Sequence, residues 1–121
     1  RGLTVRRWLG PSLLYLKVIK VNETTWLHQL DWQLVESLCH EALHFARGGL
    51  GKACLEEECD AFVAGLQAEA TVKGLVPAVP LTVDGVRVAA FVRRSYPGLA
   101  SRPDYAPVGE TPEWLRQQAG L

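Results

Sequence analysis

His40, Glu41 and His44 form the pattern H-E-x-x-H, whose residue types and spacing suit metal chemistry. On a helix, residues i and i+4 lie one turn apart on one face, so His40 and His44 can direct two imidazoles at one point. Two imidazole nitrogens are half of a tetrahedral zinc site. Glu41 lies beside that point, where a carboxylate can take a proton from a water that the metal activates. The pattern predicts two metal ligands and a general base, and its alternative is a surface helix with two solvated histidines.

A third ligand is offered further along the chain by Glu56, which forms a second i, i+4 pair with Asp60. A carboxylate at Glu56 can complete the set of three protein ligands that a catalytic zinc ion requires. Asp60, one turn later, can accept the outer N–H of a ligating histidine and so fix its tautomer. We therefore predict Glu56 as the third metal ligand and Asp60 as the residue that orients a histidine.

Glu56 is preferred to its neighbours Glu57 and Glu58 because of the apolar pattern that follows. Successive helical residues point about 100° apart, so the three carboxylates cannot all face one ion. An apolar stripe extended back by one turn reaches Glu56, and an unpaired carboxylate on a buried face would be costly. The sequence thus predicts that Glu57 and Glu58 are solvated. The stripe consists of Cys59, Val63, Leu66 and Ala70.

The order H-E-x-x-H followed by E-x-x-x-D resembles the gluzincin branch of the zincin metallopeptidases. Residues 56–63 are similar to the segment E-x-x-A-D/N-x-F-A of membrane zincin peptidases and of compact ImmA/IrrE-type peptidases, with Cys59 where those families often have alanine. The resemblance covers roughly residues 13–70. It implies an α+β fold, a small zincin-like domain in which a short sheet packs on a metal-binding helix and a second helix carries the third ligand.

The same resemblance implies a zinc-dependent metallopeptidase that hydrolyses a peptide or protein substrate, with Zn²⁺ as cofactor and Glu41 as general base. One alternative is a catalytically silent zincin-like module that binds zinc and a regulatory partner. Another is a proteolytic subunit acting on one repressor or toxin-type partner. The far wall of a substrate cleft would come from residues 75–121 or from a partner chain. The chemistry of side chains alone leaves four candidate donors to a reaction oxyanion, namely His28, Arg93, Tyr96 and Tyr105.

Length and composition favour a single globular domain over residues 1–121. The chain is 48% hydrophobic and 21% charged, and its formal net charge is zero. A neutral chain lacks the electrostatic attraction that nucleic acid or an anionic membrane would need. No apolar run reaches the ~18 residues of a membrane helix. The odd cysteine count of 3 argues against a disulfide framework and for a reducing, cytoplasmic setting, with the thiols packed between helices.

Hydrophobic periodicity and breaker residues predict the elements that hold these residues. Residues 1–12 read as a strand start or an irregular arm, and Leu13–Val21 as a strand. Asp31 is expected to cap a helix reaching about Arg47, where glycines end it. Further helices are predicted over Leu55 to about Lys73, ended by Gly74, over Val86–Tyr96, capped by Thr82 or Asp84, and from Thr111-Pro112-Glu113 through Gln118. Ser101–Gly109 reads as an irregular loop.

Overall fold

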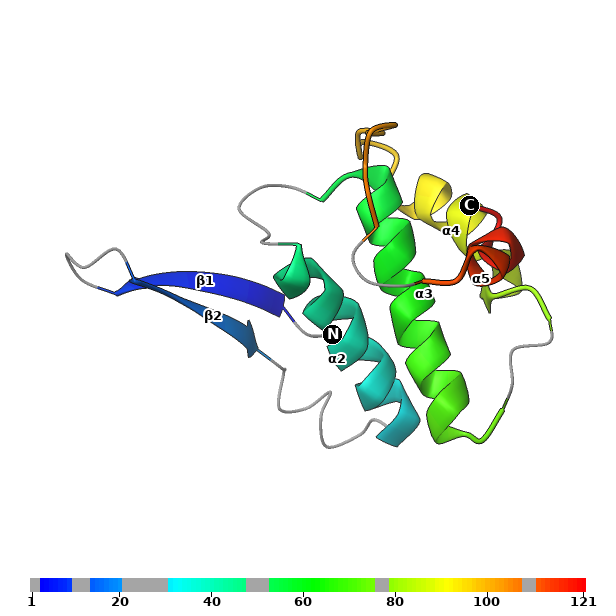
Figure 1. Ribbon diagram of the computed structural model, residues 1–121, viewed down its shortest axis with the longest axis horizontal. Coiled ribbons are helices and arrows are strands. Elements are labelled where there is room, and N and C mark those ends of the chain that lie inside the picture. The colour runs from blue at the N-terminus through cyan, green and yellow to red at the C-terminus, as the bar shows by residue number, and fades with distance from the viewer. Residues whose placement is uncertain (1–2, 10–13, 21–30, 48–52, 76–78, 108–110) are drawn as a thin grey trace.

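The computed structural model describes residues 3–9, 14–20, 31–47, 53–75, 79–107 and 111–121. Within these ranges the fold is α+β and mostly helical (Figure 1). The elements in chain order are β1 (Leu3–Leu9), β2 (Leu14–Lys20), α2 (Asp31–Ala46), α3 (Leu55–Val72), β3 (Thr82–Val83), β4 (Val86–Arg87), α4 (Val88–Ser95) and α5 (Glu113–Ala119). None of the helices in this part of the chain combines the length and apolar character that crossing a bilayer requires.

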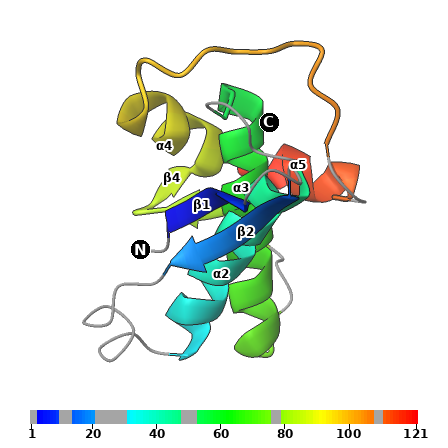
Figure 2. The same cartoon turned by 90° about the vertical axis from the view of Figure 1, so that its left-hand side faces the viewer.

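Strands β1 and β2 form an antiparallel pair whose register places Leu3 opposite Lys20 and Leu9 opposite Leu14. This ribbon projects from the helical part of the molecule and contacts α2 at its base (Figures 1 and 2). The predicted strand is confirmed in β2, and of the two readings of the N-terminal segment the strand is the one found, over Leu3–Leu9. His28 and the predicted connection around it lie outside the described residues.

Helices α2 and α3 run antiparallel and are placed as the sequence predicts. Asp31 opens α2, and α3 ends where Lys73 closes its last turn and Gly74 adopts a left-handed φ of 69°. The thiol of Cys54 caps the start of α3, because its Sγ accepts the N–H of Glu57 at 3.4 Å. Figure 1 shows α3 between α2 on one side and α4 and α5 on the other.

The two sides of α3 bury two different sets of residues. One side packs against α4, α5 and Leu81 in the main hydrophobic core, made of Cys59, Phe62, Val63, Leu81, Val88, Ala89, Val92, Leu115 and Ala119. The other side meets α2 closely: a Cβ added at Gly65 would lie 2.7 Å from the backbone oxygen of Glu36. A glycine at this position therefore lets the two helix backbones approach.

The region before α4 differs from the prediction of one helix over Val86–Tyr96. Asp84 and Gly85 have φ angles of 52° and 77° and form the turn of a small hairpin, with β3 paired to β4. An Asp-Gly pair favours such a turn because both residues tolerate positive φ. The helix consequently begins at Val88, and neither Thr82 nor Asp84 caps it. The last helix, α5, begins at Glu113 with Pro112 as its N-cap. The sequence predicted Pro112 as the first helical residue, so the helix begins one position later than predicted.

Candidate metal centre

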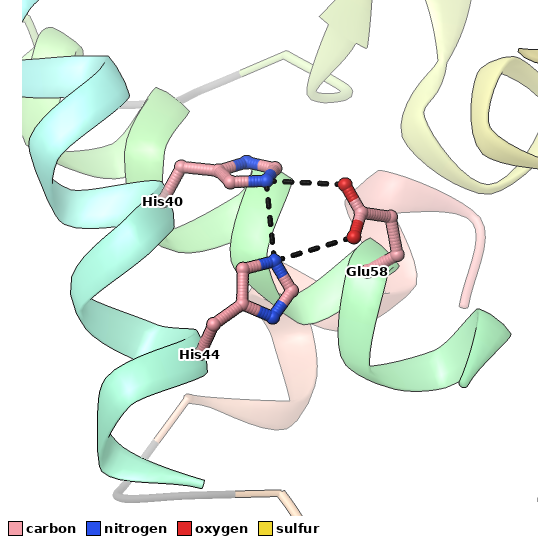
Figure 3. Close-up of side chains that lie close together, drawn as sticks. All are labelled: His40, His44 and Glu58. Atoms are coloured by element: carbon pink, nitrogen blue, oxygen red, sulfur yellow. Dashed lines mark hydrogen bonds and ion pairs between the residues drawn. The ribbon is translucent and has the colours of Figure 1, made fainter. Parts of the chain in front are cut away.

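His40 and His44 project from one face of α2 toward the first turn of α3, as the i, i+4 spacing predicts (Figure 3). Their Nε2 atoms lie 3.4 Å apart. The carboxylate that meets them belongs to Glu58: its Oε1 is 3.1 Å from Nε2 of His40 and its Oε2 is 3.2 Å from Nε2 of His44. The three side chains are largely removed from solvent, with exposures of 5%, 14% and 11% for His40, His44 and Glu58.

Glu56, predicted as the third ligand, lies elsewhere. Its carboxylate accepts a hydrogen bond from the hydroxyl of Ser101 and another, of 2.7 Å, from the backbone N–H of Arg102. These bonds hold the segment after α4 against the start of α3. The structure thus corrects the predicted position: Glu58 and not Glu56 is beside the two histidines, and Glu57 and Glu58 are both buried instead of solvated.

The physical reason is that α3 has two buried stripes. The predicted stripe through Cys59 and Val63 exists, but it faces the core shared with α4 and α5. The stripe facing α2 contains Glu58 and Gly65, and Phe62 lies between them at steps of four and three, where it contacts His40 of α2 as well as the core. The small residue at Gly65 was the signal in the sequence that marks this second contact face.

Asp60, predicted to orient a histidine, instead binds α5. Nη1 of Arg116 donates to both of its carboxylate oxygens, at 2.9 and 3.0 Å. Asp60 is 1% exposed, and burial raises the pKa of its carboxyl even though the charge of Arg116 opposes this. The expected orienting role falls to Glu57, whose Oε1 accepts a hydrogen bond from Nδ1 of His44 at 2.8 Å.

The hydrogen bond to Glu57 decides what His44 can bind on its other side. Because Nδ1 carries the hydrogen donated to Glu57, Nε2 of a neutral His44 has no hydrogen. Its lone pair points at Glu58 and His40. A lone pair facing a carboxylate oxygen is unfavourable unless a cation lies between them. Burial alone would lower the pKa of His44, but hydrogen bonds and charge attraction from Glu58 and Glu57 outweigh it and raise the pKa to about 9.

Glu58 responds in the opposite sense. Burial would raise its pKa, but hydrogen bonds and charge attraction from His40 and His44 lower it to about 2. A proton on Nε2 of His44 would therefore make its contact with Glu58 favourable, and a divalent cation bound between the three side chains would do the same. Three ligands about 2.0–2.2 Å from one tetrahedral ion would stand about 3.3–3.6 Å apart. The two Nε2 atoms are 3.4 Å apart, and each lies 3.1–3.2 Å from a different oxygen of Glu58, so the three side chains converge closely enough to hold one metal ion.

Glu41 follows His40 directly on α2 and is half-buried. It precedes His44 by three positions, so the two occupy neighbouring positions on the helix surface. Of the candidate oxyanion donors, Tyr96 has its ring centroid 6.5 Å from that of Phe62, which in turn packs on His40. Tyr105 stacks under the guanidinium of Arg47, at 4.2 Å, and Arg93 is exposed on α4. His28 lies outside the described residues.

The three cysteines are free thiols, and Cys59 belongs to the core shared with α4 and α5. Cys54 and Cys59 are buried as the sequence predicts, whereas Cys39, beside His40 on α2, is half-buried. Within the ranges that the structure describes, the His40–His44–Glu58 group is the cluster whose ligand atoms could hold a metal ion. No known protein family, curated protein or solved structure matches this chain.

Proposed function

We propose that this chain is a zinc-dependent metallopeptidase whose ion is held by His40, His44 and Glu58. The observation that supports this most is the convergence of two histidines and one carboxylate from α2 and α3, with Glu57 fixing the tautomer of His44. Three protein ligands leave a fourth position for water or substrate, as in catalytic zinc sites. When bound, zinc would polarise a substrate carbonyl and lower the pKa of a water molecule.

Glu41 is the proposed general base. A carboxylate next to the first histidine can accept a proton from the attacking water and pass it to the leaving amine. The proposed substrate is a peptide or protein, and a partner chain is a candidate for the wall that completes the cleft. We expect Glu41→Gln to keep zinc bound but to remove hydrolysis of a peptide library that a chelator also abolishes. Hydrolysis that persists in Glu41→Gln with zinc still bound would exclude this role.

A silent zinc-binding module is the second candidate, and low exposure favours it. The ligand side chains are only 5–14% exposed, which leaves little ligand surface for a substrate to reach. Such a module would bind zinc with the same residues and hydrolyse no peptide in the library. Hydrolysis of the peptide library therefore distinguishes the two functions, whereas both predict that the protein binds zinc.

Zinc binding itself is tested by a pair of variants on one helix turn. Glu58→Ala should lower zinc affinity by at least about 100-fold, because it removes a ligand and leaves two buried imidazoles facing each other. Glu56→Ala should change affinity less than about threefold, since its carboxylate holds Ser101 and Arg102. Competition against a chromophoric chelator measures both. A wild-type protein that takes up no zinc contradicts the proposal, and the reverse order of losses contradicts the ligand set.

A further inference from the structure

The two histidines of the candidate metal centre are held by different means. Nδ1 of His44 donates to Glu57 at 2.8 Å, which fixes both the tautomer and the direction of the ring. Nδ1 of His40 is buried, and none of the described residues offers it a hydrogen bond. Nε2 of His40 faces Glu58 at 3.1 Å, so on the Nδ1 side the ring is held by packing and not by a hydrogen bond.

Phe62 supplies that packing. Its ring lies edge-to-face with the imidazole of His40, with centroids 4.6 Å apart and planes at 81°. Phe62 is 1% exposed, and the ring of Phe91 lies at 5.3 Å and 75° from it. Perpendicular contacts at these distances are the favoured geometry for such rings. Because Phe62 is enclosed, it cannot move aside, and it limits rotation of the histidine ring against it.

We propose that Phe62 is a positioning residue for the metal centre, an inference that rests on the proposed zinc binding. It keeps the imidazole of His40 turned so that Nε2 points at Glu58 and His44, which Glu57 achieves for His44 through a hydrogen bond. Phe62 follows Glu58 by four positions on α3. One helix face therefore carries both a ligand and the ring that orients another ligand.

Phe62→Leu tests this by removing the ring while keeping an apolar side chain. We expect zinc to bind about 10-fold more weakly, at the lower end of the loss seen when a group that orients a ligand is removed. The visible spectrum of the cobalt-substituted protein should also change, because the field around the ion depends on the direction of His40. Val63→Ala is the control: it shortens the next side chain of α3, which is equally buried but belongs to the core shared with α4 and α5, and it should leave affinity within about twofold and the spectrum unchanged.

Phe62→Met is a second variant, since an unbranched side chain fills an irregular space and is tolerated in cores. Circular dichroism of the chelator-treated proteins identifies the variants that fold. If either folded Phe62 variant binds zinc within about twofold of wild type and keeps its cobalt spectrum, the positioning role is overturned. If Val63→Ala loses as much affinity as Phe62→Leu, general packing of the core and not this contact is responsible, and the role is again overturned. Failure of the wild type to bind zinc would instead remove the proposed function.

Discussion

At the scale of single residues, the acidic run that opens α3 divides its carboxylates among separate partners. The four carboxylates lie within five consecutive positions, yet each contacts a different part of the molecule. Glu56 binds Ser101 and Arg102, Glu57 binds His44, Glu58 faces both histidines, and Asp60 binds Arg116. Helical geometry explains the division, because successive side chains point about 100° apart and α3 has neighbours on several sides.

The bond between Glu57 and His44 leads to a graded prediction. Glu57→Ala should weaken zinc binding by roughly 10–100-fold, because the tautomer of His44 loses its acceptor. Glu57→Gln should lie between this variant and the wild type, since its amide oxygen still accepts the hydrogen bond but carries no charge. Glu69→Ala is the control: it removes a carboxylate of α3 that pairs with Lys73 instead. Zinc affinities of the three variants check the order, and a Glu57→Ala protein that binds like wild type would exclude the orienting role.

The two histidines were predictable from spacing, whereas their acidic partner was not. The i, i+4 rule needs only local helix geometry, so it placed His40 and His44 together correctly. Choosing among Glu56, Glu57 and Glu58 requires knowing which neighbour lies on each side of α3. Those neighbours come from distant parts of the chain: Ser101 follows Glu56 by 45 positions. Apolar periodicity holds no information on such contacts, and the sequence marks the side of α3 that faces α2 only by the small residue at Gly65.

At the scale of elements, the approach of α2 to α3 sets the distance across the metal centre. Gly65→Ala would place a Cβ 2.7 Å from the backbone oxygen of Glu36, which cannot rotate away as a flexible side chain could. We expect a loss of about 1–3 kcal/mol of stability from this overpacking, reduced by the better helix propensity of alanine. Zinc affinity should fall as well, because α2 must move relative to Glu58.

Gly98→Ala is the control for this substitution, since a Cβ there meets nothing within 4 Å. It should change stability by less than about 0.5 kcal/mol. Urea unfolding of both proteins in chelator, followed by zinc titration, measures the two effects separately. A Gly65→Ala protein as stable as wild type, with unchanged zinc affinity, would show that the helices do not need this close contact.

Most long elements were predictable because they carry strong periodic patterns with clear ends. Asp31 opens α2 and Gly74 closes α3 as their chemistry dictates. The hairpin at Asp84 and Gly85 was missed, although its dipeptide is a strong turn signal. Its strands span only two residues each, too short for an alternating pattern to show beside the helical pattern that follows.

At the scale of the whole molecule, α3 is the centre to which the other elements attach. It shares its core side with α4 and α5, and the pair between Asp60 and Arg116 adds a largely buried polar contact to α5. On its other side it meets α2 through Gly65 and Glu58, and Phe62 contacts both the core and His40 of α2. The metal centre therefore lies where α2 joins the rest of the helices, so a cation there would stabilise that junction and the fold with it.

Stability of the metal-free protein should consequently depend on pH through His44 and Glu58. The pKa of His44 is raised from 6.5 to about 9, so its stabilising charge is fully present below pH 6.5 and is lost as pH rises through 9. The pKa of Glu58 is lowered from 4.5 to about 2, so its contribution is present above pH 4.5 and is lost as pH falls through 2. These two groups together predict greatest stability between pH 4.5 and 6.5.

Urea midpoints of chelator-treated protein at acidic, intermediate and alkaline pH measure this dependence. In His44→Gln the stability should fall much less as the pH is raised, since glutamine does not titrate. Zinc should remove this fall in stability in the wild type, because a bound cation would take the place of the proton on His44, and neutral imidazole is the form that binds it. A wild-type protein that is more stable in chelator above pH 9 than at pH 5.5, with His44→Gln following the same curve, would show that no cation is needed at this junction.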